Sequence, residues 1–324
     1  MTMDATGGYF GLELPAPGGE FHRDVNRFQS ARAGFLALLR AHRPKAVWMP
    51  WYICQSMLEP LLVSGTRVIR YAIDERFQVV DAAPDEGEWL LYVNYFGLCD
   101  HTVDEILNRF PPERVVIDQS QAFYGRPLPC LATIYSPRKF FGVPDGGYLA
   151  TTRPIPVPTE EDEQSVARAM HLLKRIAQGA ETGYADYVAT EEGLRMQEPM
   201  HMSTFTQRML ASIDYADVRS RRRANFAYLH AALGHLNRFG IEVSVEPTPL
   251  CYPFLGASSG TRAALARQRI YTPCYWQEVI NEVAAPIFER SLANSALFLP
   301  CDQRLSQPQL QHMIDVLSNY LEHP

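Results

Sequence analysis

A lysine stands among apolar residues in the stretch IYSPRKFFGVPDGGYLAT, residues 134–151. A lysine amine serves covalent catalysis when it is partly desolvated and projects from a rigid element. Lys139 meets this description in sequence, and Ser136 offers a hydroxyl on the same turn. The expected apolar walls are the residues that follow it, Phe140, Phe141 and Val143. The alternative is a basic loop in which Lys139 reaches into solvent, and the stretch alone does not decide between the two.

An aspartate, Asp118, ends the apolar strand pattern RVVI. A carboxylate at the tip of a buried strand is unfavourable unless it meets a cation or a protonated ring nitrogen. Capping of the following segment is the alternative. Lys139 follows after one further strand pattern, and the pair suits pyridoxal phosphate. A lysine forms a Schiff base with the aldehyde of that cofactor, and an aspartate keeps its pyridine nitrogen protonated.

Strand and helix patterns alternate through the first half of the chain. Apolar residues at helical spacing run from Ala33 to Leu39, with Ser30 as the expected N-cap and Pro44 closing the helix. A second helix pattern, QSMLEPLLVSG, ends at Gly65. Short apolar runs predict strands at KAVWMP, TRVIRYAI, EWLLYVNYFG, RVVIDQS, LATIYS and GGYLATT. This alternation predicts an α/β fold with a mostly parallel sheet covered by helices.

The carboxyl ends of parallel strands are where ligands bind in open α/β sheets. Three promising segments fall there, Tyr95–Gly97, Asp118–Gln121 and Ser136–Lys139. We therefore expect the chemistry at this edge.

The pattern of alternating strands and helices ends near residue 155, where the proline-rich segment RPIPVPTEEDEQ is followed by helical stretches. We expect an N-terminal arm (1–24), a large cofactor-binding α/β domain (25–210), and a connecting helix with a smaller C-terminal α+β domain (211–324). The last part holds GIEVSVEP, LCYPFLG, a helix near GTRAALARQ and a final amphipathic helix, QPQLQHMIDVLSNYLEH.

The order of these motifs resembles the fold-type-I pyridoxal-phosphate enzymes, whose fold is like that of aspartate aminotransferase. More narrowly, it resembles the DegT/DnrJ/EryC1/StrS family of sugar aminotransferases. The motifs are Asp118-x-x-Gln121 after a strand, Lys139 within SPRKFFG, and Asp145-Gly-Gly opening the next strand. Further support comes from QSARAGFLALL, MPWYICQSMLEPLLVSG, YVNYFG and the closing ALFLPCDQRLSQPQLQHMIDVL. The resemblance is densest over residues 25–151.

The resemblance implies roles for residues around the cofactor ring. Lys139 would hold the cofactor and later carry a proton between two carbons. Asp118 would pair with the pyridine nitrogen, and Gln121 would reach the ring hydroxyl. Trp51 and Tyr52 are candidates to stack on the ring, although both could equally be core aromatics.

A phosphate fits the predicted helix start at Ser30, Ala31 and Arg32, because N–H groups and the helix dipole there favour an anion. Ser136 would be a second donor. The resemblance places Asn94 and Tyr95 where family members face the cofactor or the substrate.

Three departures from the family pattern concern the phosphate. Arg32 replaces a small or hydroxyl residue and could neutralise the phosphate or bind an anionic substrate. Ile134 stands where the family often has a serine. The segment that lends a phosphate ligand from the neighbouring subunit is not evident, and EPMHMSTF, with His201 or Ser203, is the nearest stretch.

The resemblance implies an aminotransferase that moves an amino group, with glutamate as the expected donor, onto a keto sugar linked to a nucleotide. It also implies a homodimer with shared active sites. Two alternatives stay open: a pyridoxal-phosphate sugar dehydratase or lyase, and a protein that keeps the fold for sensing or assembly without turnover.

Composition excludes other classes. The formal charge of −6 argues against a general affinity for nucleic acid or anionic membranes, and RSRRR at 219–223 is interpreted as a solvated helix face. No apolar run approaches the ~20 residues of a membrane span, so we expect a cytoplasmic protein. The six cysteines lack a C-x-x-C pair and the nine histidines lack metal-ligand spacing. We expect reduced thiols, mostly in the core, and no metal site.

Overall fold

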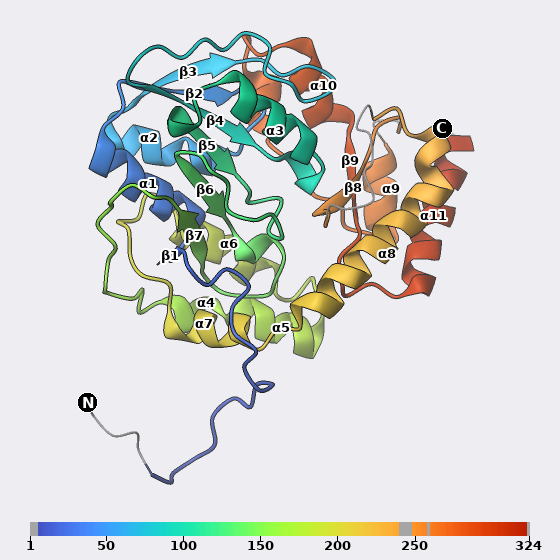
Figure 1. Ribbon diagram of the computed structural model, residues 1–324. Coiled ribbons are helices and arrows are strands. Elements are labelled where there is room, and N and C mark those ends of the chain that lie inside the picture. The colour runs from blue at the N-terminus through green and yellow to red at the C-terminus, as the bar shows by residue number, and fades with distance from the viewer. Residues whose placement is uncertain (1–5, 240–247, 258–259, 323–324) are drawn as a thin grey trace.

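The computed structural model describes residues 6–239, 248–257 and 260–322 (Figure 1). Its main sheet has seven strands in the order β1-β7-β6-β5-β4-β2-β3. The strands are β1 (Asn26–Phe28), β2 (Ala46–Pro50), β3 (Arg67–Tyr71), β4 (Glu88–Val93), β5 (Val115–Asp118), β6 (Ala132–Tyr135) and β7 (Gly147–Ala150). Only β7 runs antiparallel to its neighbours β1 and β6. The predicted α/β class with a mostly parallel sheet is confirmed.

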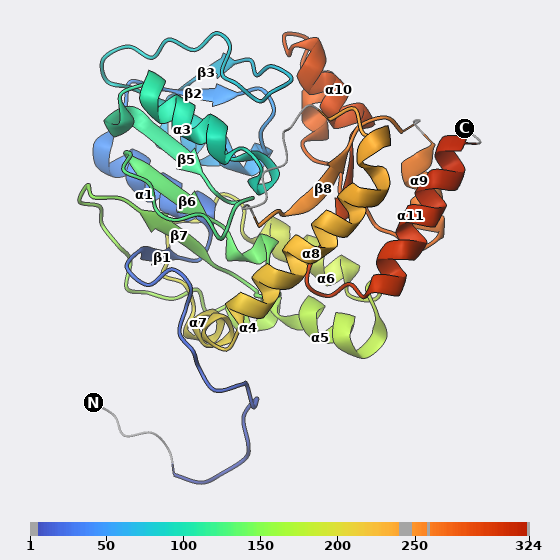
Figure 2. The ribbon, with the colours of Figure 1, turned by 45° about the vertical axis from the view of Figure 1, so that its right-hand side comes forward.

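The described residues form α-helices along the whole chain, and several of them cover the two faces of this sheet. The α-helices are α1 (Ala31–His42), α2 (Glu59–Ser64), α3 (Asp100–Arg109), α4 (Ser165–Arg168), α5 (Met170–Gln178), α6 (Tyr184–Gly193), α7 (Thr204–Ala211), α8 (Tyr215–Leu233), α9 (Thr261–Arg267), α10 (Ile287–Ser295) and α11 (Gln307–Glu322). The step from β2 to β3 and the step from β4 to β5 run in opposite directions along the sheet. Right-handed crossovers therefore place α2, with α1 beside it, on one face and α3 on the other (Figures 1 and 2). No helix in the described ranges is long and apolar enough to cross a bilayer.

The start of α1 is pinned against β7. The Ser30 hydroxyl accepts a hydrogen bond from the Ala33 N–H at 3.2 Å, so the predicted N-cap is confirmed. A Cβ atom built on Gly147 would lie 2.2 Å from the Ala31 nitrogen and from the Ser30 carbonyl carbon. Only glycine allows this approach, and the neighbouring Gly146 has a φ of +119°. The Asp-Gly-Gly motif thus positions the first turn of α1 at the sheet edge.

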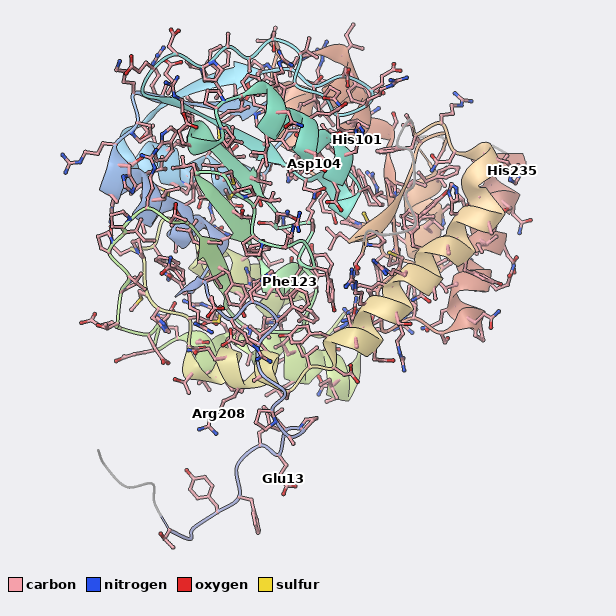
Figure 3. The ribbon with its side chains drawn as sticks, in the orientation of Figure 1. Glu13, His101, Asp104, Phe123, Arg208 and His235 are labelled. Atoms are coloured by element: carbon pink, nitrogen blue, oxygen red, sulfur yellow. The ribbon has the colours of Figure 1, made fainter. Side chains whose placement is uncertain are left out.

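The later part of the chain builds a second, two-stranded antiparallel sheet from β8 (Cys251–Phe254) and β9 (Leu297–Pro300). The long helix α8 leads from the side of the main sheet to this small one, and α11 packs along α8 (Figure 2). The helical stretch from Thr204 breaks after Ala211, where the Asp214 side chain caps a new helix. The segment GIEVSVEP lies outside the described residues. The described part of the arm, which includes Glu13, extends away from the body (Figures 1 and 3).

One arginine of the RSRRR segment is not solvated, which corrects the expectation for that position. Arg222 is 2% exposed, and its guanidinium donates to the carbonyl oxygens of Phe140, Pro249 and Leu250. The guanidinium also lies 4.5 Å from the centre of the Phe140 ring. Arg222 therefore ties the segment after Lys139 to the start of β8.

All six cysteines are unpaired. Cys99, Cys251 and Cys301 are buried, Cys54 and Cys130 are partly buried, and Cys274 is exposed. The expected core location therefore holds fully for half of them.

A buried histidine packs behind β6. His22 is 4% exposed, and its Nε2–H donates to the Phe123 carbonyl oxygen at 2.7 Å. Its ring centre lies 4.0 Å from that of Tyr135. Burial lowers the pKa of His22 to about 4, against the weaker raising effect of the hydrogen bond. The folded protein therefore holds His22 neutral.

Replacing Gly147 with alanine should destabilise the protein by about 3 kcal/mol, because backbone atoms cannot move aside for the new methyl group. Urea unfolding followed by circular dichroism measures the change. Gly18→Ala is the control, since a Cβ there meets nothing within 4 Å, and it should change stability by less than about 0.5 kcal/mol. Equal effects of the two substitutions would contradict the close packing of α1 on β7.

Stability should fall as pH drops from about 6.5 to 4, because in that window the unfolded chain protonates His22 and the folded chain does not. A pKa difference of this size corresponds to roughly 3 kcal/mol. The variant His22→Gln should flatten the dependence of unfolding free energy on pH relative to the unchanged protein. His101, which is labelled in Figure 3 and has an 87% exposed side chain, provides the control His101→Gln. An unchanged slope in His22→Gln would disprove the neutral buried state.

Candidate functional site

Strand register places Asp118 on the face of the sheet that carries α1. Asp118 is in register with Ile134 of β6, and Ile134 is in register with Leu149 of β7. Residues paired across neighbouring strands share a face, and Leu149 packs against Gly34 of α1, where an added Cβ would lie 3.3 Å from the Leu149 Cβ. The first turn of α1 meets β7 at Gly147, at the edge where β5 and β6 end. The structure thus brings Asp118 and the start of α1 to one edge and one face.

Asp118 and Gln121 form a buried polar pair at this edge. Asp118 is 3% exposed, and its Oδ1 accepts the Ser120 N–H at 2.8 Å in an Asx-type turn. The expected alternative, a local cap, is therefore present on one of its two oxygens. The Gln121 Oε1 accepts the Phe96 N–H at 2.7 Å, whereas its buried Nε2 has no partner among the described residues. An unpaired buried amide donor is unfavourable by about 1–3 kcal/mol, so it is a natural contact for a ligand acceptor.

Lys139 is the last residue of the short 3-10 helix η4 (Pro137–Lys139), which follows β6. Its backbone N–H donates to the Ser136 carbonyl oxygen at 3.3 Å. The side chain is exposed, and its Nζ bonds to no residue in the described ranges. Lys139 thus follows the strand next to the one that Asp118 ends.

The apolar residues after Lys139 do not wall it in, and that expectation is wrong. Phe140, Phe141 and Val143 are buried in an aromatic cluster that also contains Phe123, which is labelled in Figure 3. They anchor the backbone of the segment because their rings pack against the core. The lysine itself points to solvent in the single chain.

Lysine is scarce in this protein, and its scarcity is a sequence signal that the motifs around Lys139 do not contain. The sequence contains Lys45, Lys139 and Lys174, against 27 arginines. Lys45 donates to the Glu86 carbonyl oxygen, and Lys174 pairs with Asp186 at 2.7 Å. Arginine thus supplies almost all basic charge, while a lysine without a partner in the described residues stands at 139. Arginine cannot serve as an amine nucleophile, so the choice of lysine at this position favours covalent chemistry.

The predicted phosphate residues cluster at the start of α1. The Ser30 hydroxyl is occupied as the N-cap, whereas Ala31 and Arg32 form the first turn and are partly exposed. The Ser136 side chain, 9% exposed overall, makes no hydrogen bond with the residues that the structure describes. Ile134 presents an apolar side chain on the same face as Asp118. Backbone groups and Arg32 are therefore the main anion-binding features of this corner.

The two aromatic candidates for ring stacking are already in contact with other side chains. Tyr52 is fully buried, with the Tyr95 ring centre at 5.9 Å and the Trp276 ring centre at 4.4 Å. Trp51 is partly buried, and the Arg70 guanidinium lies 5.2 Å from its ring centre. In this arrangement Tyr52 behaves as a core aromatic. Trp276, which packs against the Tyr52 ring, comes from a distant part of the chain. The motif around Tyr52 therefore could not predict this contact.

The two predicted substrate residues are fully buried. The Asn94 Oδ1 accepts the Cys99 N–H at 3.0 Å, and its Nδ2 donates to the Asp100 Oδ1 at 2.6 Å. The Tyr95 hydroxyl donates to the Tyr52 carbonyl oxygen at 2.9 Å. Both side chains thus stabilise the turn after β4, and their contact with a substrate stays a prediction.

The stretch EPMHMSTF also has internal roles. The Ser203 hydroxyl caps α7 by accepting the Thr206 N–H, and the Ser203 N–H donates to the Asp145 carboxylate at 3.3 Å. Burial raises the pKa of Asp145, against the lowering effect of hydrogen bonds from Thr206, Ser165 and Ser203. The His201 ring bonds to the Met202 carbonyl oxygen. This stretch supports the Asp-Gly-Gly turn within its own chain.

An ion-pair network surrounds Arg32 and was not predicted. The Arg32 Nη1 pairs with the buried Glu59 at 3.0 Å, and Arg195 pairs with the same carboxylate at 2.8 Å. Glu191 of α6 lies between Arg32 and Arg138. The residues of this ion-pair network are far apart in sequence, so local motifs could not predict the network.

Comparisons with known proteins show the fold. No family model and no curated protein matches the chain. A DegT/DnrJ/EryC1/StrS aminotransferase from Brucella abortus matches with a TM-score of 0.62 and 15% identity, over 91% of this chain and 85% of that one. Bacillus subtilis NtdA with its bound cofactor PMP matches with a TM-score of 0.66 and 16% identity, over 93% and 74%. A sugar aminotransferase from Micromonospora echinospora matches with a TM-score of 0.57 and 16% identity, over 91% and 87%. The chain therefore has the fold of these aminotransferases, as the motif order predicts.

Proposed function

We propose that this protein is a pyridoxal-phosphate-dependent aminotransferase of the DegT/DnrJ/EryC1/StrS type. The observation that carries the proposal is the buried Asp118 on the α1 face, followed by the buried Gln121, with Lys139 after the neighbouring strand. The shared fold with three aminotransferase structures supports it. The expected division into an arm, a large domain and a small domain belongs to the same proposal.

The residues at this edge fit the cofactor. Within the part of the chain that the structure describes, one carboxylate oxygen of Asp118 accepts no hydrogen bond and the buried Gln121 Nε2 donates none. A protonated pyridine nitrogen and a ring hydroxyl would satisfy these two groups. The first turn of α1 offers N–H groups and a dipole to the phosphate.

Each residue then has a defined task. The bound cofactor supplies an electron sink for the carbanion formed at the substrate carbon. Asp118, buried away from water, holds the proton on the ring nitrogen. Lys139 would hold the cofactor through its amine, and its free Nζ would take a proton from one carbon and return it to a neighbouring carbon. Its exposed side chain leaves room for this movement.

We further propose glutamate as the amino donor and a nucleotide-linked keto sugar as the acceptor. The Micromonospora echinospora protein is a sugar aminotransferase, which supports the acceptor class. The fate of the cofactor bears on the choice between transfer and dehydration or elimination, because its conversion to the amine form by glutamate favours transfer. Spectral screening of nucleotide-linked keto sugars then identifies the acceptor.

A homodimer is part of the proposal. Helix α5 buries none of its residues, and large apolar side chains of α5 and α6 are exposed, with Ile176 at 86% and Tyr184 at 65%. This surface adjoins the Arg138–Glu191 pair next to Lys139. A second copy packed here would cover apolar area and desolvate the lysine.

A protein without turnover is the second candidate. The exposure of Lys139 and the complete burial of Tyr52 favour it, because no ring face of Tyr52 is offered to a cofactor. A protein that stays colourless and does not bind added pyridoxal phosphate would support this candidate.

Borohydride should fix pyridoxal phosphate on Lys139. In the variant Lys45→Arg/Lys174→Arg, Lys139 is the sole remaining lysine, and one equivalent of cofactor should still attach, as measured by intact mass and peptide mapping. Lys139→Ala should lose this attachment and reduce transamination by at least about a thousandfold. Full activity in Lys139→Ala would refute the assignment.

Ile176→Glu should weaken the dimer by at least about tenfold, because it places a charge in an apolar interface. Sedimentation velocity over a range of concentrations measures this change. Ile287→Glu is the matched control on α10, where the isoleucine is 80% exposed. A monomer for the unchanged protein, or equal weakening by both substitutions, would contradict the proposed interface.

A further inference from the structure

One carboxylate lies between two guanidinium groups beside Lys139. The Glu191 Oε1 accepts a hydrogen bond from the Arg138 Nη2, and its Oε2 lies 3.9 Å from the Arg32 Nη2. Arg138 directly precedes Lys139, and Arg32 is in the first turn of α1. The Glu191 carboxylate is thus the anion that the two guanidinium groups contact in this structure.

The arginines are fixed, and the glutamate is the more mobile member. The side chains of Arg32 and Arg138 are 14% and 11% exposed, whereas that of Glu191 is 38% exposed. The buried Glu59 holds Arg32 from the other side at 3.0 Å. The Arg138 Nε is buried and has no partner in the described ranges. The more exposed Glu191 side chain can therefore turn toward solvent, while burial keeps the two guanidinium groups in position.

The location favours a phosphate over a carboxylate. The dipole of α1 and its first-turn N–H groups attract a dianion more strongly than a monoanion. Arginine pairs with phosphate through parallel hydrogen bonds. Asp118 lies on the face of the sheet that carries α1, so under the proposed function a ring nitrogen would meet Asp118 while the phosphate of the same molecule meets the arginines.

We propose that Glu191 is an internal stand-in for an anion, and that Arg32 and Arg138 bind the phosphate of pyridoxal phosphate when Glu191 moves aside. This inference rests on the proposed function for the identity of the ligand. Arg138 then supplies a polar contact that the apolar Ile134 cannot.

Binding of pyridoxamine phosphate and of pyridoxamine, neither of which attaches to the lysine, isolates the phosphate contribution. Calorimetric dissociation constants are measured for the unchanged protein, Arg138→Gln, Glu191→Gln and Glu192→Gln. Glu192 is the matched control, since it neighbours Glu191 but pairs with Arg195. Arg32 is left in place because its removal would strip the buried Glu59 of a partner.

Arg138→Gln should weaken pyridoxamine phosphate by about tenfold and leave pyridoxamine within about twofold. Glu191→Gln should tighten pyridoxamine phosphate by roughly five- to tenfold, because the competing carboxylate is gone. Glu192→Gln should change neither ligand. Equal effects of Glu191→Gln and Glu192→Gln, or no effect of Arg138→Gln, would overturn the inference. The proposed function would still stand in that case if pyridoxamine binds.

Inorganic phosphate and uridine monophosphate separate the two hypotheses. Suppose that neither pyridoxamine nor pyridoxamine phosphate binds, but that Glu191→Gln gains affinity for inorganic phosphate. Anion binding by Arg32 and Arg138 then stands and the proposed function fails. Tightening of uridine monophosphate alone would assign the site to the nucleotide of the substrate and overturn the cofactor assignment. If no phosphate compound binds to Glu191→Gln, the inference is refuted.

Discussion

The register between β5 and β6 is the constraint on which the site depends. Because Asp118 pairs with Ile134, and Ile134 with Leu149, the carboxylate is forced onto the face where α1 packs. A slip of one residue would turn Asp118 to the opposite face. Gly147 adds the second constraint, since its lack of a side chain lets the start of α1 reach the same edge. Anion-binding groups and a buried carboxylate thereby lie at one corner of the sheet.

Buried polar groups without a hydrogen-bond partner in the described part of the chain make this corner of the sheet a candidate ligand site. Most side chains around it are satisfied by protein partners, as Asn94 and Tyr95 show. Gln121 Nε2 and Arg138 Nε are exceptions among the residues that the structure describes. A fold that buries a donor without an acceptor loses stability unless a ligand completes the bond. The proposed cofactor would supply acceptors to the first donor, and its phosphate would lie beside the second.

Local signals predicted the scaffold well. The Ser30 cap, the glycine after α2 and the positions of most strands along the chain follow from short-range chemistry, which the sequence contains. Burial of individual site residues was not readable, because it depends on distant segments. Trp276 covers Tyr52, Arg222 holds the Phe140 carbonyl oxygen, and Glu191 bridges two arginines. The apolar run after Lys139 was misread for the same reason: its rings face the core cluster.

The central claim is that the Asp118 carboxylate meets the ring nitrogen of a pyridoxal cofactor. A crystal structure of the protein with pyridoxamine phosphate tests it most directly. We expect the ring nitrogen about 2.8 Å from an Asp118 oxygen, with the Gln121 amide donating to the ring hydroxyl. A cofactor bound elsewhere, or an Asp118 carboxylate that contacts only the Ser120 N–H in the complex, would contradict it.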